Sequence, residues 1–215
     1  APRMCELTSG MMNSVGLANP GIDAFVDHVG SYMDELENRG TRVIMQMAAH
    51  SVQEMVDVVE RTEELAPHIS ALELNISCPN LARGGTPLGA TPRQAAEVMR
   101  AVRPLTTLPL LVKMAPVNVA EIGKALEAEG ANGLTLINSL SGMSIDVHTR
   151  RSRLSKPTGG MSGPLCHNVA VRMVWECAQA VRIPICGVGG VETGEDAAEF
   201  ILAGATAVSV GSANL

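Results

Sequence analysis

Apolar and polar positions follow one repeating pattern from about residue 41 to the end of the sequence. Short apolar runs, rich in β-branched residues, are each followed by a turn and then by a stretch with the 3.6-residue period of a helix. The apolar runs predict strands at 43–49, 71–77, 109–115, 132–138, 183–190 and 207–212. The periodic stretches predict helices at 51–65, 91–103, 119–129, 165–181 and 194–203.

Two of these helices begin with capping residues. Ser51 precedes a periodic apolar stretch and Glu54 follows three residues later, a spacing typical of a capping box. Thr91 and Pro92 supply a cap and then a proline at the first helical position. These signals support the predicted starts of the two helices.

Strands that alternate with helices, and that are almost continuously apolar, indicate a parallel sheet covered by helices. An open doubly wound sheet and a (β/α)8 TIM barrel both fit this order. Polar or glycine residues at nearly every strand end favour the barrel, because barrels carry their chemistry at that face. We expect residues 1–215 to form a single α/β domain, a TIM barrel that is incomplete because about six of its eight βα units are visible.

The segment 139–164 has neither the helical nor the strand period, and it is too long for an ordinary connection. It predicts a lid or a binding loop.

The composition limits the partners of this chain. With 46% hydrophobic residues, twelve Met and only 2% aromatic residues, the core must be built from aliphatic side chains and methionine. A net charge of −6, without a long basic block, argues against nucleic-acid binding. The sequence contains no apolar run of about 18 residues and no signal-peptide pattern at its start, so we expect a cytoplasmic protein that is not inserted in a membrane.

Cysteine and histidine spacing gives no sign of a metal site. The five cysteines form no C-x-x-C pair, and the five histidines show no metal-ligand spacing. We expect any special cysteine to act as a thiol.

The segment from Asn75 to Asn80 ends the second predicted strand. Asn75 and Ser77 share one face of that strand, and Pro79 stops the pairing, so Cys78 and Asn80 lie on a loop above the strand end. A thiol in this place can serve as a nucleophile or as a base. The alternative is a small buried apolar residue.

Lys113 ends the apolar strand at 109–115. A cationic side chain among aliphatic neighbours needs an anionic partner, so Lys113 points either to a ligand or to a structural ion pair.

Glycines lie at the ends of the last two predicted strands, at Gly189, Gly190 and Gly211. Bare backbone N–H groups beside helix N-termini at the end of a barrel are typical of a phosphate site. The alternative is that these residues are simple turn glycines.

Amide side chains and a second glycine cluster add polar groups to the same end of the predicted strands. Asn13, Asn138 and Ser139, together with the glycine-rich stretch 158–163, would offer both donors and acceptors to a planar ligand with imide and carboxylate groups. Taken singly, each of them is more often a turn or cap residue.

Several longer strings resemble one family. LELNISCPN, LLVKMAP, GLTLIN, the GGMSG loop and IPICGVGGVETGEDAAEFILAGATAVSVGSANL are similar to class 1 dihydroorotate dehydrogenases, the FMN flavoproteins of pyrimidine biosynthesis. The resemblance runs from Pro2 to Leu215, and the segment 137–164 resembles the class 1B branch. In that branch the FMN subunit works with a second subunit, which carries FAD and a 2Fe–2S cluster and passes electrons to NAD⁺.

The resemblance implies a homodimer core and roles for particular residues. Cys78 would remove a proton from C5 of dihydroorotate while a hydride leaves C6 for the flavin. Lys113 would stabilise the reduced flavin, and Asn75 would contact both ligands. The substrate, dihydroorotate or its product orotate, would be bound by Asn13, Gly16, Leu17, Asn75, Asn80, Asn138 and Ser139. FMN would be held by Gly163, Gly189, Gly190, Gly211 and Ser212, the last four around its phosphate.

Three alternatives remain open. Dihydropyrimidine dehydrogenases share an N-[IL]-S-C-P string, but Asn80 and the stretch GGTPLGATP at 84–92 differ from their pattern. A phosphate-binding lyase or isomerase would explain the glycines alone. Class 1 family members begin with two more strands, one of which ends in a lysine, and continue into a closing helix, so we also expect an incomplete chain that could be an inactive fragment of the barrel.

Overall fold

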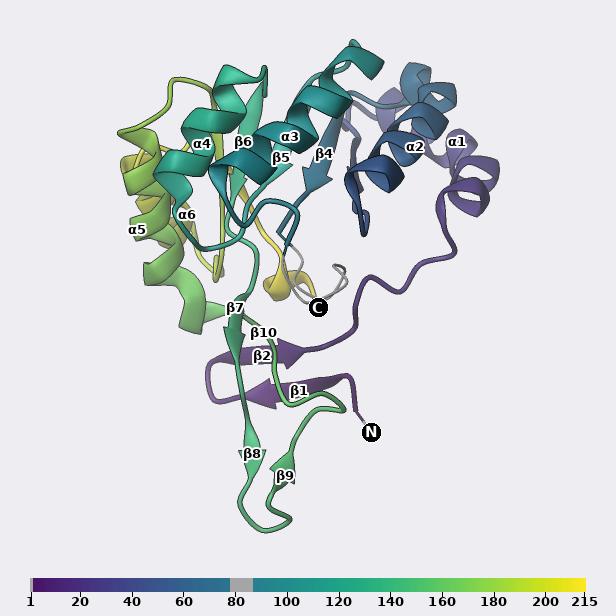
Figure 1. The fold of residues 1–215 in the computed structure, drawn as a ribbon. Helices are drawn as coiled ribbons and strands as arrows, with labels where there is room; N and C mark the ends of the chain where they lie inside the picture. The colour runs from purple at the N-terminus through teal and green to yellow at the C-terminus, as the bar shows by residue number, and fades with distance from the viewer. Residues whose placement is uncertain (1, 78–86) are drawn as a thin grey trace.

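The computed structural model describes residues 2–77 and 87–215. Its main sheet has six parallel strands in the order β12-β11-β6-β5-β4-β3 (Figure 1). The strands are β3 (Ile44–Met47), β4 (Ala71–Asn75), β5 (Leu110–Lys113), β6 (Gly133–Leu136), β11 (Ile185–Val188) and β12 (Ala207–Ser209). All six lie within the predicted runs, so the strand pattern read from the sequence is confirmed.

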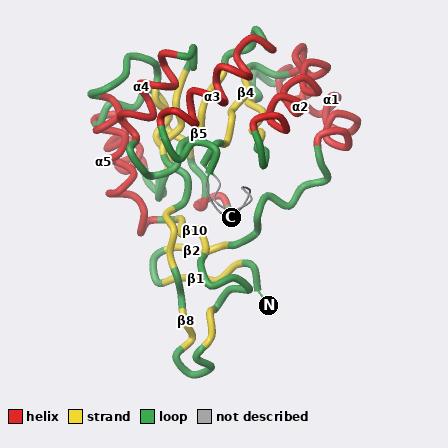
Figure 2. The backbone as a smooth tube through the Cα atoms, viewed as in Figure 1, coloured by secondary structure: helices red, strands yellow, loops and turns green. Residues whose placement is uncertain are grey.

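Six α-helices accompany these strands and lie along one side of the sheet, where they are drawn in red in Figure 2. They are α1 (Ile22–Asn38), α2 (Val52–Thr62), α3 (Pro92–Val102), α4 (Val119–Ala128), α5 (His167–Ala178) and α6 (Gly194–Leu202). Four short 3-10 helices are η1 (Glu63–His68), η2 (Arg103–Leu105), η3 (Pro164–Cys166) and η4 (Ser212–Asn214). Consecutive α-helices pack side by side around the outside, from α1 to α6.

The parallel sheet is a half-barrel. In the described part of the chain its two outermost strands, β3 and β12, each pair with one neighbour. An open, curved sheet with helices on its outer side is the architecture of an incomplete (β/α) barrel, so the predicted fold class is confirmed.

Side chains of the central strands alternate between the helices and the inside of the barrel. Leu110, Val112, Leu134 and Leu136 are fully buried and face the helices. The residues that alternate with them along the strands, including Lys113, face the inside of the barrel. This alternation puts the apolar core between sheet and helices and leaves polar groups for the barrel interior.

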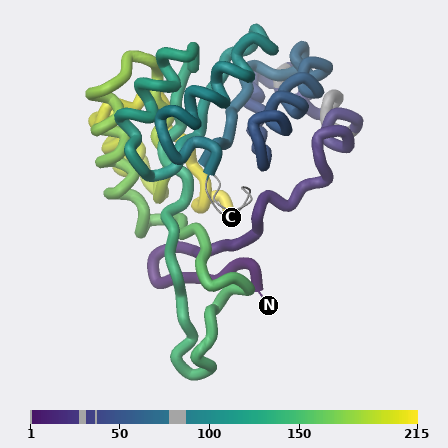
Figure 3. Tube along the Cα trace, viewed as in Figure 1, coloured from purple at the N-terminus to yellow at the C-terminus, as the bar shows by residue number. Residues whose placement is uncertain are grey.

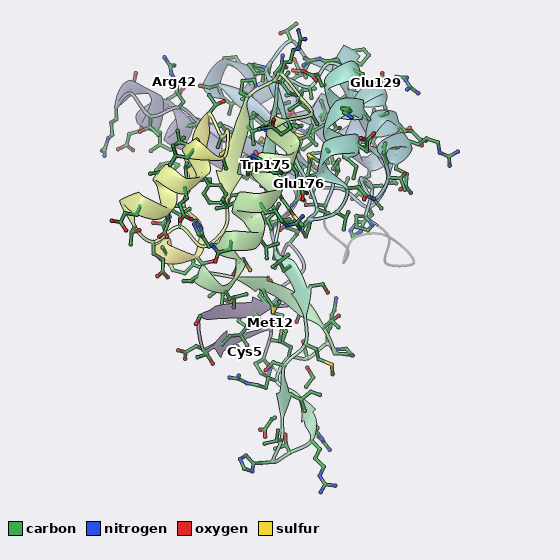
Figure 4. All side chains as sticks on the ribbon, turned by 90° about the vertical axis from the view of Figure 1, so that its left-hand side faces the viewer. Cys5, Met12, Arg42, Glu129, Trp175 and Glu176 are labelled. Carbon is green, nitrogen blue, oxygen red and sulfur yellow. The ribbon has the colours of Figure 1, made fainter. Side chains whose placement is uncertain are left out.

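Aliphatic side chains and methionines make up the core, as the composition predicts. Eight buried methionines of the described chain belong to it or to the adjoining second sheet: Met12, Met33, Met45, Met47, Met55, Met99, Met114 and Met173. Phe200 is fully buried, whereas Trp175 on α5, which is labelled in Figure 4, is 55% exposed.

The predicted helix caps are present. The Ser51 hydroxyl accepts a hydrogen bond from the Glu54 N–H at 3.1 Å, but the Glu54 carboxylate accepts from the His50 N–H rather than from Ser51. Thr91 accepts from the Gln94 N–H and Pro92 opens α3. Each cap satisfies a backbone N–H that the helix itself leaves unpaired.

A second sheet stands below the carboxyl edge of the half-barrel. It is antiparallel with the order β1-β2-β10-β7, and it joins β1 (Met4–Leu7) and β2 (Gly10–Asn13) to β7 (Leu140–Gly142) and β10 (Gly159–Ser162). Figure 3 shows the purple N-terminal hairpin beside the green segment from the middle of the chain. A two-stranded hairpin, β8 (Ile145–Asp146) with β9 (Arg151–Ser152), projects from this sheet.

This second sheet gives regular structure to the segment 139–164, for which the sequence shows no period and predicts a lid or a binding loop. The segment contains four short strands, and β10 pairs with β2 through partners such as Met161 and Met12. Met12, labelled in Figure 4 beside Cys5, is fully buried. Strands of two to four residues that are rich in Gly and Ser carry too little period to be seen in the sequence. Helix α1 and strands β1 and β2 were not predicted either.

Candidate functional site

Polar residues end the parallel strands at one edge of the half-barrel. Asn75 ends β4 and Lys113 ends β5, and the two are register partners across these neighbouring strands. Asn138 comes two residues after β6, and Gly189 directly follows β11. Because parallel strands present their carboxyl ends at a common edge, these groups converge there.

A cavity of about 480 Å³ opens at this edge, between the strand ends and β10 of the second sheet. The described residues that the sequence predicted for the site all line it: Asn13, Gly16, Leu17, Asn75, Lys113, Asn138, Ser139, Gly163, Gly189, Gly190, Gly211 and Ser212. Cys78 and Asn80 lie outside the described residues. The geometry thus brings together residues from both ends of the chain, while their roles remain predictions.

Asn75, Ser77 and Asn138 form a hydrogen-bonded cluster at this edge. Asn75 and Ser77 are 4% and 3% exposed, and the Ser77 hydroxyl donates to Asn75 Oδ1 at 2.8 Å. Asn138 Nδ2 donates to Ser77 Oγ at 2.6 Å, and Asn138 Oδ1 accepts from the Ser139 N–H at 2.8 Å. Since its oxygen is engaged by Ser77, Asn75 offers its NH₂ group to a ligand.

Lys113 carries its ammonium group into the cavity from the end of β5. In the part of the chain that the structure describes, no carboxylate lies within 4.0 Å of its Nζ atom. The alternative of a close structural ion pair is therefore not supported within residues 2–77 and 87–215. A cation without a close partner favours an anionic group in the cavity.

Two cysteines of the described chain lie near this cavity, and both are poor bases. Cys166 lines the cavity, and its thiol donates to the Met161 carbonyl oxygen at 3.3 Å. Burial raises the pKa of Cys166, and burial followed by the charge of Glu73 raises the pKa of Cys186. Both groups therefore stay protonated thiols at neutral pH, so neither can act as the base that the sequence predicts at Cys78.

A cluster of glycines forms one end of the cavity. Gly163 and Gly190 have φ angles of +98° and +65°, which glycine adopts without strain. A Cβ atom on Gly190 would come within 2.7 Å of the Gly163 carbonyl oxygen and 2.9 Å of Pro164 Cα. The glycines are thus required by a close backbone approach, which leaves main-chain N–H groups bare to a ligand.

The expected contribution of a helix N-terminus to this glycine cluster is not seen. Helix α6 begins at Gly194 after a capping box, in which Thr193 and Asp196 satisfy each other's backbone N–H groups. Residues of α6 do not line the cavity, and β12 is followed by the three-residue η4 helix. The N-terminus of α6 therefore does not contribute to the end of the cavity formed by residues 189–190 and 211–212.

Sequence reasoning missed several residues of the site. Gln46 on β3 also lines the cavity, and its amide donates to the Glu73 carboxylate at 2.5 Å. Val15 and Ala18 of the loop after β2 also line it, and His167 lies behind Gly189. The inward phase of the strands could have indicated Gln46, whereas the others depend on contacts distant in sequence.

The structure was searched for membrane-spanning helices and for metal-binding clusters among the described residues. None of the described helices is long and apolar enough to cross a membrane. Within the described residues, no cluster of three or more His, Cys, Asp or Glu side chains could hold a metal ion.

Comparison with known proteins identifies relatives along the whole chain. The family model described as dihydroorotate dehydrogenase matches residues 1–215. A protein of Geobacillus kaustophilus named dihydroorotate dehydrogenase B (NAD(+)), catalytic subunit, is 46% identical over 99% of this chain and 67% of its own length. Proteins with the same name from Geotalea uraniireducens and Lachnoclostridium phytofermentans are 46% and 45% identical, with 69% and 70% of their lengths covered.

A solved structure gives the same fold. A dihydroorotate dehydrogenase of Eimeria tenella, crystallised with ferulenol, superposes with a TM-score of 0.80 at 22% identity, over 99% of this chain and 65% of the other. The chain thus spans about two thirds of the proteins that it matches. On the family model and the identities of 43–46% to the curated relatives, this chain belongs to the dihydroorotate dehydrogenase family, in its B-type, NAD-linked branch.

Proposed function

We propose that this protein oxidises dihydroorotate to orotate in pyrimidine biosynthesis, with FMN as the hydride acceptor. The observation that carries the proposal is the convergence of three features in one cavity. They are the amide cluster, a lysine without a close anionic partner, and a glycine cradle formed by Gly163, Gly189, Gly190 and Gly211. Each is a group that the family resemblance assigns, and they reach the cavity from six different strands or loops.

The described residues fit FMN at both ends of the cavity. At one end the Gly163 and Gly190 backbones approach so closely that a Cβ atom has no room, which suits a phosphate bound by main-chain N–H groups. Gly189, Gly211 and Ser212 complete this end. At the other end the ammonium of Lys113 would compensate negative charge on the flavin ring. When bound, FMN supplies hydride-acceptor chemistry to the site.

The amide cluster fits a planar substrate. Dihydroorotate presents a ring imide and a carboxylate, which together require both donors and acceptors. Asn75 and Asn138 are already held by Ser77, so they reach a ligand with little loss of side-chain freedom. Asn13, Ser139 and the loop residues Gly16 and Leu17 would complete the substrate end, with Asn80 from outside the described residues.

Cys78 is proposed as the general base that takes the C5 proton of the substrate. It follows Ser77 directly, and Ser77 belongs to the amide cluster. The raised pKa values of Cys166 and Cys186 leave no competing thiolate of the described chain at this cavity.

We further propose that reduced FMN is reoxidised through a second subunit. The relatives are named NAD(+)-linked catalytic subunits, a name that implies a separate electron-transfer subunit. The class 1B resemblance supplies its cofactors, FAD and a 2Fe–2S cluster, together with a homodimer of the catalytic chain and a cytoplasmic location. Purification of the native complex should yield a second flavoprotein with iron–sulfur absorbance, and NAD⁺ reduction should require it.

Anaerobic mixing of the FMN-loaded protein with dihydroorotate tests the activity directly. The flavin absorbance band should bleach, and orotate should appear in equal amount. Dihydrouracil serves as the matched substrate without a carboxylate. Bleaching by dihydrouracil instead would favour the dihydropyrimidine dehydrogenase alternative, and bleaching by neither substrate, with FMN bound, would support the inactive-fragment alternative.

A further inference from the structure

His167 is a buried titratable residue that the proposed mechanism does not use. It opens α5 and is 7% exposed, and its ring lies edge-on to the buried Phe200, with ring centroids 5.2 Å apart. It does not line the cavity, but it lies directly behind the glycine cradle, since a Cβ atom on Gly190 would come within 3.0 Å of His167 Cβ.

Both ring nitrogens of His167 face oxygen acceptors. Nδ1 lies 2.9 Å from the Gly189 carbonyl oxygen, and Nε2 lies 2.9 Å from Glu199 Oε2. A carbonyl oxygen has no proton to donate, so Nδ1 is the donor in the hydrogen bond to Gly189.

The other side of the ring faces negatively charged groups. Helix α6 presents the carboxylates of Glu199 and Asp196, and Asp196 Oδ1 lies 3.8 Å from Nε2. Asp196 keeps its negative charge because backbone N–H groups of Glu192 and Thr193 lower the pKa of its carboxyl, with a smaller contribution from His167. The neighbouring Cys166 on η3 remains an uncharged thiol.

The hydrogen bond from His167 to Gly189 also orients the peptide group between Gly189 and Gly190, which faces the cavity. In a planar trans peptide the carbonyl and the next N–H point in opposite directions. A Gly189 carbonyl that is held on His167 therefore turns the Gly190 N–H away from His167. Gly189 and Gly190 both line the cavity, so the ring determines how this peptide unit faces a ligand.

We propose that His167 is a positioning residue for the cofactor phosphate: it fixes the Gly189–Gly190 peptide so that the Gly190 N–H binds the phosphate of FMN. The inference rests on the proposed function, because it assumes that FMN occupies the cavity. Without the hydrogen bond from Nδ1, the peptide is free to rotate.

The test is the Kd of FMN for the apoprotein, measured by quenching of flavin fluorescence at pH 7. His167→Gln should weaken binding roughly fivefold, the size expected for one buried hydrogen bond.

Riboflavin, which lacks the phosphate, separates a positioning role from a merely structural one. His167→Gln should leave the Kd of riboflavin unchanged, because the Gly190 N–H is proposed to bind the phosphate. His148→Gln, a substitution of an exposed loop histidine, is the matched control and should leave the Kd unchanged.

A second measurement keeps the inference falsifiable if His167→Gln fails to fold. The ¹⁵N NMR shifts of the His167 ring in the wild type should show a proton on Nδ1. An unprotonated Nδ1, or equal weakening of FMN and riboflavin binding by His167→Gln, would overturn the inference. Wild-type protein that binds no FMN at any pH would instead refute the proposed function.

Discussion

At the scale of single residues, burial in the fold controls which cysteines can act as bases. Burial raises the pKa of Cys177 to about 12, and it also raises the pKa values of Cys166 and Cys186. A thiol that acts as a base near neutral pH must be stabilised as a thiolate by its surroundings. Only direct substitution can assign that role to Cys78.

Replacement of Cys78 by serine should slow flavin reduction by dihydroorotate about 10²–10⁴-fold near pH 7, which is the usual contribution of a general base. Serine is a far weaker base at this pH, but it has nearly the same size, so FMN should remain bound. Stopped-flow absorbance under anaerobic conditions measures the rate. Cys5→Ser on β1 is the control, and equal loss of FMN from Cys78→Ser would show that the residue is structural.

Lys113→Ala should weaken FMN binding and also lower turnover, by about 10²-fold or more, because it removes a cation from the cavity. Kd and kcat for the purified protein are the measurements. Lys124→Ala, an exposed lysine paired with Glu121 on α4, is the matched control. Unchanged values of both quantities would remove Lys113 from the site.

Gly190→Ala should reduce FMN affinity at least tenfold and destabilise the fold by about 1–3 kcal/mol, since φ is +65° and the new methyl group would meet the Gly163 carbonyl oxygen. Gly194→Ala is the control because a Cβ atom there meets nothing within 4 Å. Fluorescence titration and urea unfolding measure the two effects. An alanine variant that binds FMN normally would show that the loop adapts.

At the scale of elements, the outer helices stabilise the half-barrel without contacting the ligand cavity. Helix α3 places Ala95, Val98, Met99 and Val102 in the core. Its start was predictable from Thr91 and Pro92, because a cap depends on residues within one turn of the chain.

Thr91→Ala should lower the free energy of unfolding by about 1 kcal/mol, the usual effect of losing an N-cap hydrogen bond, here to the Gln94 N–H. FMN affinity should not change, since α3 does not line the cavity. Thr91→Ser retains the hydroxyl and should restore most of the stability. Urea unfolding of the three proteins decides the outcome, and equal stability of all three would contradict the assigned cap.

At the scale of the whole molecule, two sheets form opposite walls of one cavity. The half-barrel supplies Asn75 and Lys113, and the antiparallel sheet supplies Asn13 and Gly160. A ligand that touches both walls holds them together, so binding and stability are linked.

FMN at a hundred times its Kd should raise the free energy of unfolding by about 2.7 kcal/mol. Riboflavin has the same ring but lacks the phosphate, so at the same concentration it should stabilise the protein much less. Urea unfolding with each ligand measures the difference. Equal stabilisation by the two flavins would argue against a phosphate site at Gly189 and Gly190.

The sequence by itself determined the parts of this protein that depend on neighbouring residues. Period, caps and strand ends gave the six parallel strands, five of the six helices and the groups at the carboxyl edge, including Lys113 and Gly189. These features follow from side-chain alternation and local backbone geometry, which a short stretch of chain carries in itself. The family resemblance added what composition and spacing did not contain, namely flavin as the ligand.

Only the tertiary structure decided the second sheet and the support of the glycine cradle. Strand β2 pairs with β10 through Asn13 and Gly160, residues 147 positions apart, and neither strand has a strong pattern of its own. His167 likewise reads as an ordinary helix residue until Gly189 and Glu199 lie on either side of its ring. Pairing between distant segments is selected by the whole fold, so it cannot be predicted from a local sequence pattern.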